Sequence, residues 1–177
     1  MNDESWFLKT ERLGFRVWTE NDFDLAWALW GDARVTRLIG GPFGAARVRE
    51  RLDEEIARMR TAGVQYWPIF RLADGAHVGC CGLRPYSAEA RVLELGFHLR
   101  FDHWGHGYAS ESAREVIRYA FDSLHCASLF AGHHPENADS ARLLGRLGFR
   151  ATHDELYAPT GLMHHCYALE SPASREG

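Results

Sequence analysis

The feature of this chain that most constrains its fold is a glycine-rich turn that leads directly into a periodic helix. Residues 103–112 read His-Trp-Gly-His-Gly-Tyr-Ala-Ser-Glu-Ser, and we call this segment the cradle. Gly105 and Gly107 let the backbone turn with its N–H groups exposed, and the helix N-terminus adds partial positive charge. A pyrophosphate site is therefore predicted; the alternative is a tight turn whose glycines serve local geometry alone. The helix itself is predicted from apolar residues at steps of three and four: Ala109, Ala113, Val116, Ile117, Ala120, Phe121 and Leu124.

Two hydrophobic periods alternate along the rest of the chain and predict a mixed α/β fold. Patterns typical of strands occupy 13–18, 65–72, 77–84, 91–100, 127–133, 149–157 and 163–169. Helical periodicity follows a capping signature at 19–22, begins again near Val48, and recurs after the cradle and after Asn137. The segment 31–45 is rich in glycine and is predicted to be a loop. This order predicts a mixed central sheet with helices on both faces.

Composition fits one domain and excludes several classes of partner. With 177 residues, 46% of them hydrophobic, the chain can bury a core as a single domain over 1–170, followed by a polar tail at 171–177. The 20 basic and 24 acidic residues are spread along the chain, so we expect no nucleic-acid partner. Its N-terminus is acidic and its apolar runs are short, so we expect no membrane partner and a cytoplasmic location. Four cysteines without C-x-x-C spacing read as cytosolic thiols: Cys80, Cys81, Cys126 and Cys166.

The strand at 91–100 separates an apolar face from an ionisable one. Alternation places Leu93, Leu95, Phe97 and Leu99 toward the core, and Val92, Glu94, Gly96 and His98 on the opposite face. Gly96 leaves room between Glu94 and His98 for another backbone or a ligand. Glu94 is therefore a candidate catalytic carboxylate, and the alternative is a solvated or salt-bridged strand residue.

A second short helix, closed by a glycine and an aromatic residue, follows the cradle. Residues 137–149 read Asn-Ala-Asp-Ser-Ala-Arg-Leu-Leu-Gly-Arg-Leu-Gly-Phe. Together with the cradle, this segment resembles the two halves of the acyl-CoA site in the GCN5-related N-acetyltransferase (GNAT) superfamily. The residues at 104–111 and Ser140 are most similar to those of one branch, the ribosomal-protein N-terminal (RimJ/RimL-like) acetyltransferases. The resemblance covers roughly residues 8–170.

The resemblance implies a fold, an activity and a set of binding residues. It implies a mostly antiparallel sheet of about seven strands, in which strand 91–100 splays from strand 127–133 and acyl-CoA lies between them. It implies direct, acetyl-CoA-dependent transfer of an acetyl group to a primary amine, on a protein N-terminus or a small molecule, with no metal. The residues it assigns to acetyl-CoA are Phe97, His98, Leu99, Trp104, Gly105, His106, Gly107, Tyr108, Ala109, Ser110, Asn137 and Ser140.

Acetyl transfer to an amine needs a proton acceptor and a donor for the departing thiolate. Glu94 is our first candidate for the base, followed by His98, His133, Glu155 or a water. Most of the superfamily places a tyrosine four residues before the Gly-Phe pair, where this chain has Leu144. Leucine cannot donate a proton, so the resemblance points to Ser140, one helical turn earlier, as the donor. The alternative is that Asn137 caps the helix and Ser140 only supports its first turn.

Three other interpretations stand beside this one. A dinucleotide-binding Rossmann domain needs a third glycine where Ser110 stands and an acidic residue where Gly132 and His133 stand. A noncatalytic acyl-CoA sensor of the same fold keeps the cradle without turnover. The sequence leaves three points open: which amine is the acceptor, whether the acyl group is strictly acetyl, and whether the protein is a homodimer. A metal site is the third interpretation, and the residues that suggest it are His133, His134, His164, His165 and Cys166. Adjacent residues of a strand face opposite ways, so at most one residue of each adjacent pair could bind the same metal.

Overall fold

The computed structural model describes residues 6–172, so residues 173–177 of the predicted tail and the first five residues lie outside the described range. No helix in this range is long and apolar enough to cross a bilayer. The strands are β1 (Leu8–Lys9), β2 (Leu13–Phe15), β3 (Tyr66–Arg71), β4 (His77–Ser87), β5 (Val92–Leu99), β6 (Ser128–His133), β7 (Arg150–Tyr157) and β8 (Leu162–Glu170). The helices are α1 (Phe23–Trp30), α2 (Ala33–Thr36), α3 (Ala45–Ala62), α4 (Tyr108–Asp122) and α5 (Ala138–Arg146).

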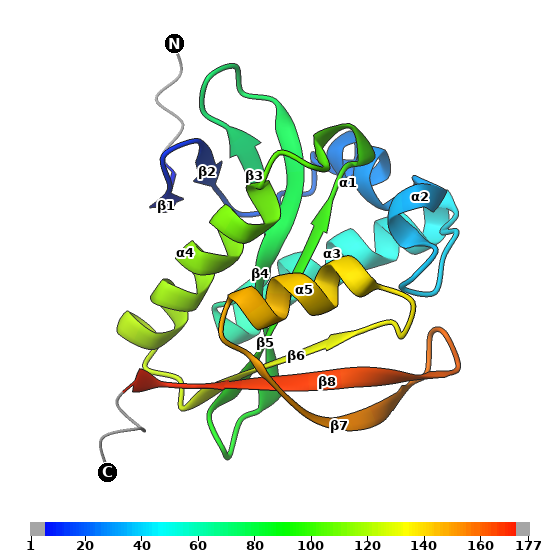
Figure 1. Cartoon of the computed structure of the whole chain (residues 1–177). Helices are drawn as coiled ribbons and strands as arrows, with labels where there is room; N and C mark the ends of the chain where they lie inside the picture. The colour runs from blue at the N-terminus through cyan, green and yellow to red at the C-terminus, as the bar shows by residue number, and fades with distance from the viewer. Residues whose placement is uncertain (1–5, 173–177) are drawn as a thin grey trace.

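The eight strands form one sheet in the order β1-β2-β3-β4-β5-β6-β8-β7. Every neighbouring pair is antiparallel except β5 and β6, which are parallel and are connected through α4 (Figure 1). The predicted mixed, mostly antiparallel sheet is therefore confirmed. The Rossmann interpretation is wrong, because that fold requires a parallel sheet.

Two local predictions need correction. The strand expected at 13–18 ends at Phe15, because beyond it the Trp18 N–H donates to the Gln65 side chain at 2.9 Å and not to a neighbouring strand. The segment 31–45, expected to be a loop, contains the short helix α2. Asp32 caps that helix by accepting a hydrogen bond from the Arg34 N–H at 2.9 Å. This cap stabilises the start of a helix in a segment whose glycines otherwise disfavour one.

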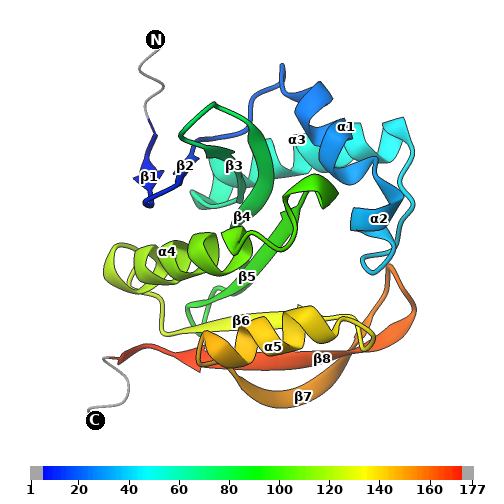
Figure 2. The same cartoon turned by 45° about the horizontal axis from the view of Figure 1, so that its top comes forward.

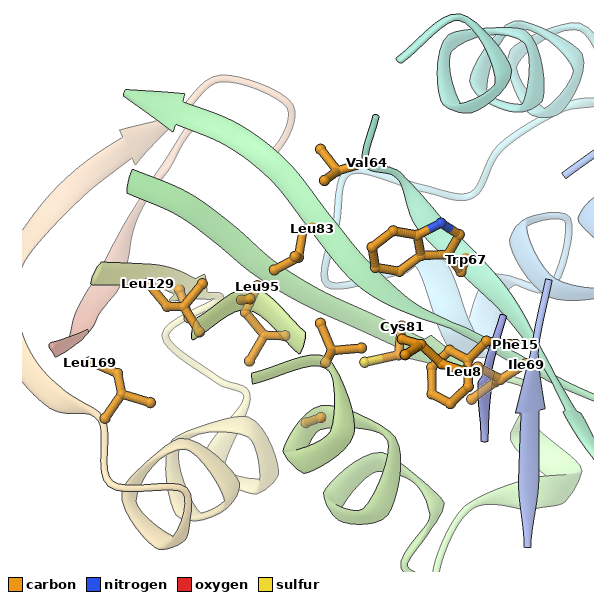
Figure 3. Packing of buried hydrophobic residues seen from close by; sticks show 14 of the residues in the cluster. Leu8, Phe15, Val64, Trp67, Ile69, Cys81, Leu83, Leu95, Leu129 and Leu169 are labelled. Carbon is orange, nitrogen blue, oxygen red and sulfur yellow. The ribbon is translucent and has the colours of Figure 1, made fainter. Parts of the chain in front are cut away.

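Helices cover both faces of the sheet. The helices α4 and α5 lie on one side, and α1, α2 and α3 gather toward the other (Figures 1 and 2). The larger core lies between the strands and α4 and α5, where Leu83, Leu95 and Leu129 are buried (Figure 3). A second buried cluster, which includes Leu52 of α3 and Tyr66 of β3, lies under the N-terminal helices. The sheet thus presents a separate layer to each group of helices.

The strands β5 and β6 pair over only three residues and then diverge. The paired positions are Val92 with Ser128, Leu93 with Leu129, and Glu94 with Phe130. Beyond Glu94, β5 continues to Leu99 against β4, and no strand within residues 6–172 pairs with it on the β6 side. The predicted splay of these strands is confirmed, and we call it the strand divergence. It places main-chain groups of β5 at an open edge.

Candidate active site

The cradle connects β5 to α4, and its geometry suits an anion. Gly105 and Gly107 have φ of 77° and 79°, a left-handed conformation that favours glycine. Helix α4 begins at Tyr108, directly after Gly107, and no described side chain caps its first turn. The amides at the helix start therefore remain available where the helix dipole is positive. Trp104 of the cradle also contacts the end of β5, where its Nε1 donates to the Leu99 carbonyl at 2.9 Å.

The cradle is held by residues from a distant part of the sequence, Thr10 and Arg12, which no local sequence pattern indicates. Arg12 Nη1 donates to the His106 carbonyl at 3.1 Å, and Arg12 Nε donates to Glu111 Oε2 at 2.7 Å. Glu111 also accepts a hydrogen bond from the Thr10 hydroxyl. Burial raises the pKa of the Glu111 carboxyl, but the hydrogen bonds from Thr10 and Arg12 outweigh it, so the pKa lies below its ordinary value. The turn before α4 is thereby tied to the β1–β2 connection.

Glu94 lies at the strand divergence, on the sheet face that α3 covers. It is the last residue of β5 that pairs with β6, and it lies opposite Arg84 of β4. Burial raises the pKa of Glu94, and Arg84 and Tyr66 oppose that rise only in part. A carboxylate with a raised pKa is suited to accept a proton closer to neutral pH than an ordinary glutamate does.

The other two positions on the Glu94 face of β5, Gly96 and His98, are in contact with side chains of the protein itself. A Cβ on Gly96 would meet the Tyr66 hydroxyl at 2.2 Å, so the room beside Glu94 is filled by a phenol. His98 accepts a hydrogen bond at Nδ1 from Trp30 Nε1 at 3.3 Å. Burial lowers the pKa of His98 well below its ordinary value, so the ring is neutral with Nδ1 already engaged. These contacts favour Glu94 over His98 as the base.

The two remaining candidates for the base are less well placed. His133 Nδ1 donates to the His134 carbonyl at 2.8 Å, and His133 Nε2 accepts from the Tyr167 hydroxyl at 3.1 Å. Both of its ring nitrogens are therefore engaged. Glu155 is half exposed on β7 and accepts a hydrogen bond from the Tyr86 hydroxyl at 3.0 Å. The same carboxylate also contacts His153 Nε2 at 3.2 Å, so it is already engaged by two side chains.

The histidines at the ends of β6 and β8 do not form one ligand shell. His133 faces His165 with ring centroids 5.6 Å apart, and His134 faces His164 at 5.4 Å. The two pairs lie on opposite faces of the sheet, because adjacent residues of a strand alternate. The Cys166 thiol contacts the Glu155 carboxylate instead, with Sγ 3.7 Å from Oε2.

Helix α5 places Ser140 near its start and Leu144 in the core. The Asn137 side chain accepts a hydrogen bond from the Ser140 N–H at 3.1 Å, so Asn137 caps the helix as the alternative interpretation expected. This contact uses the Ser140 main chain and leaves the hydroxyl without a hydrogen bond among the described residues. Leu144 is 2% exposed and packs in the core below α5. Ser140 as proton donor stays a prediction.

The comparisons with known proteins identify the family. The family model described as "Acetyltransferase (GNAT) domain" matches residues 12–150. The chain belongs to the GNAT acetyltransferase family. It is 31% identical over 145 residues to "Uncharacterized N-acetyltransferase p20" of Bacillus licheniformis, which covers 81% of this chain and 82% of the relative.

Solved GNAT structures have the same fold. An acetyltransferase from Agrobacterium tumefaciens has a TM-score of 0.78 at 25% identity, over 93% of this chain and 94% of that one. The ribosomal L7/L12 α-N-protein acetyltransferase RimL, solved with coenzyme A, has a TM-score of 0.80 at 15% identity, over 95% and 99% of the chains. The family, the GNAT fold and the acetyltransferase activity expected from the sequence are confirmed. Ribosomal-protein acetyltransferases are among the structural neighbours.

In this GNAT chain, α3 contributes buried charged residues that were not among the candidates predicted from the sequence. Arg51 and Glu55 are buried on the inner face of α3, beside the apolar Leu52. Glu55 is fully buried, and its carboxylate pairs with Arg84 at 2.5 Å and with Arg58 at 2.8 Å. Two charges four residues apart on an otherwise apolar helix face were the available signal. They place an ionic cluster beside Glu94.

Proposed function

We propose that this GNAT acetyltransferase transfers an acetyl group from acetyl-CoA directly to a primary amine in a ternary complex. The amine is the α-amine of a protein or belongs to a small molecule. One observation carries the proposal: β5 and β6 diverge directly after the Glu94–Phe130 pair, and the uncapped start of α4 follows the open end of β5. This arrangement supports a thioester between an anion site and the half-buried carboxylate of Glu94.

The coenzyme half of the proposal uses mostly main-chain groups. The pyrophosphate would bind to the amides from Gly105 to Ser110, whose conformation Arg12 supports by holding the His106 carbonyl. The pantetheine arm would lie along the open edge of β5, pairing with main-chain groups from Phe97 to Leu99. The coenzyme A bound to RimL, a protein of the same fold, supports this choice of ligand.

The chemical step then follows from the placement of Glu94 and Ser140. Glu94, directly or through a water, accepts a proton from the amine, and the amine nitrogen attacks the thioester carbonyl carbon. A strand N–H stabilises the negative charge that develops on the carbonyl oxygen. The carbon–sulfur bond breaks, and the coenzyme A thiolate takes a proton from the Ser140 hydroxyl, which regains one from solvent. Glu94 releases its proton to solvent, and the products are an acetylated amine and free coenzyme A.

The cysteines support transfer in one step. All four are buried, and burial raises their pKa, to about 12 for Cys81 and about 11 for Cys166. The thiolate is the nucleophilic form of cysteine, so a raised pKa disfavours an acetyl-cysteine intermediate.

Replacing Gly107 with valine is expected to weaken coenzyme A binding by about 100-fold or more, the equivalent of two charge-assisted hydrogen bonds. Valine disfavours the φ of 79° at this position, and its side chain would occupy the space that a phosphate approaches. Isothermal titration measures the affinity, with His106→Ala as the control. His106→Ala should bind nearly normally, because the proposed donors are main-chain groups. Tight binding by Gly107→Val would remove the pyrophosphate assignment.

Replacing Ser140 with alanine is expected to lower kcat by roughly 10- to 10³-fold, with little change in acetyl-CoA affinity. The helix cap survives in this variant, because Asn137 accepts from the main-chain N–H of residue 140. Steady-state kinetics and a parallel titration measure the two quantities. If Ser140→Ala turns over normally, water protonates the thiolate and Ser140 has no chemical role.

The proposed function is tested by measuring thiol release from acetyl-CoA with a panel of primary amines. We expect amine-dependent release, with one acetylated amine detected by mass spectrometry for each thiol. Gly107→Val serves as the control for thiol release that does not need the cradle. Coenzyme A binding without amine-dependent release from any member of the panel would instead indicate the noncatalytic sensor.

A further inference from the structure

Five charged residues meet on the sheet face that α3 covers. The helix α3 contributes Arg51, Glu55 and Arg58, β4 contributes Arg84, and β5 contributes Glu94. We call this group the acceptor-side cluster. With both carboxylates ionised, three guanidinium groups face two carboxylates, which leaves one positive charge in excess. The chain as a whole has a net charge of −4, so this local excess runs against its overall balance.

Glu55 forms its ion pairs with residues other than Arg51. Glu55 Oε1 pairs with Arg84 at 2.5 Å. Glu55 Oε2 pairs with Arg58 at 2.8 Å and accepts a hydrogen bond from the Tyr66 N–H at 2.9 Å. Arg51 lies one helical turn before Glu55, but no ion pair of Arg51 occurs in the part of the chain that the structure describes.

Arg51 is therefore a buried cation without an ion-pair partner among the described residues. It is 5% exposed, and its Nε has no hydrogen-bond partner among residues 6–172. Its guanidinium carbon lies 4.8 Å from the centroid of the Trp30 ring, and Trp30 Nε1 donates to His98 of β5 at 3.3 Å. Stacking on an indole offsets only part of the cost of burying a charge. An unpaired polar group at a site is expected where a ligand completes it.

We propose that Arg51 binds a carboxylate of the acceptor, so that the enzyme acetylates amines whose own molecule carries a carboxylate. The inference rests on the proposed function, since it names the substrate class of the same site. The planar guanidinium of arginine matches a carboxylate with two parallel hydrogen bonds. Two sources supply this chemistry: the α-carboxylate of a small amino-acid-type amine, and an acidic side chain near the N-terminus of a peptide.

Binding of reaction products tests the proposal without requiring turnover. The probes are N-acetyl amino acids, their C-terminal amides, and N-acetyl dipeptide amides whose only carboxylate is an acidic side chain. Each is titrated into protein saturated with coenzyme A. We expect one carboxylate-bearing set to bind roughly 10- to 100-fold more tightly than its uncharged counterpart, as a charged hydrogen bond predicts. Which set shows the preference identifies the source of the carboxylate.

The variant Arg51→Met should bind the carboxylate-bearing and uncharged probes about equally, while Arg51→Lys should keep part of the preference. Equal binding of acids and amides by the wild-type protein, no binding of either, or a preference that survives in Arg51→Met would each overturn the proposal. Thiol release separates this inference from the proposed function. Equal turnover of acids and amides contradicts the inference alone, whereas no turnover despite an Arg51-dependent preference contradicts the proposed function alone.

Stability separates a binding role for Arg51 from a structural one. If Arg51 serves a ligand, Arg51→Met should unfold at the same temperature as the wild type or higher, because an unpaired buried charge is replaced by an apolar side chain. The control is Arg60→Met on the same helix, where the side chain is 71% exposed. A large loss of stability in Arg51→Met, with none in Arg60→Met, would indicate that Arg51 supports the fold and would contradict the proposal.

Discussion

Replacing Glu94 with glutamine is expected to lower kcat by about 10²- to 10⁴-fold, the usual contribution of a general base. The amide has nearly the same shape as the carboxylate but cannot accept the proton, so acetyl-CoA affinity should change little. Steady-state kinetics with an accepted amine measures the loss. The control is Glu155→Gln, which removes the half-exposed carboxylate of β7 and should leave kcat nearly unchanged.

The pH profile gives an independent check on Glu94. Burial raises the pKa of this carboxyl, so the active, ionised form is lost as the pH falls through a value above that of an ordinary glutamate. In the wild type, kcat/KM should therefore decrease on the acidic side at a pH above the ordinary glutamate range. That decrease should disappear in Glu94→Gln. An unchanged acidic limb in the variant would assign the base to another group.

Replacing Glu55 with glutamine is expected to lower the free energy of unfolding by about 3–5 kcal/mol, the usual loss when a buried ion pair is broken on one side. Glu55 is fully buried, and its removal takes away the carboxylate with which the guanidinium groups of Arg58 and Arg84 form ion pairs. Urea denaturation, followed by tryptophan fluorescence, measures the change.

The matched control for this stability prediction is Glu54→Gln, the preceding residue on α3. Its carboxylate is 41% exposed and pairs with Arg47 at the surface. Exposed ion pairs contribute about 0–1 kcal/mol, so this variant should unfold almost as the wild type does. Similar, small losses in both variants would mean that water screens the buried cluster and that Glu55 does not hold it together.

The turn and helix start to which we assign coenzyme A could be predicted from the sequence because their signal is local. The conformations of Gly105 and Gly107 and the start of α4 depend on neighbouring residues, and the two glycines precede the helix directly in the sequence. The alternation in β5 likewise predicted that Leu95 is buried and that Glu94 lies on the opposite face.

The remaining parts of the site depend on contacts between distant segments. Arg12 and Glu111 are 99 residues apart in sequence, and no pattern near either of them predicts their contact. The glycine at Gly96 predicts room for a ligand, but Tyr66 of β3 fills that space. Tyr66 reaches Gly96 only because β3 and β5 both pair with β4, and no pattern within β5 indicates this. The charge on Arg51 becomes informative only once its burial and its lack of a partner are known.

A crystal structure of the protein with coenzyme A tests the central claim most directly. The account predicts the pyrophosphate on the amides between Gly105 and Ser110, and the pantetheine arm along the open edge of β5 from Phe97 to Leu99. The sulfur atom should then lie at the strand divergence, on the side of Glu94. Coenzyme A bound elsewhere, for example in the hollow lined by Gly148, Arg150 and Glu170, with the space between β5 and β6 unoccupied, would contradict it.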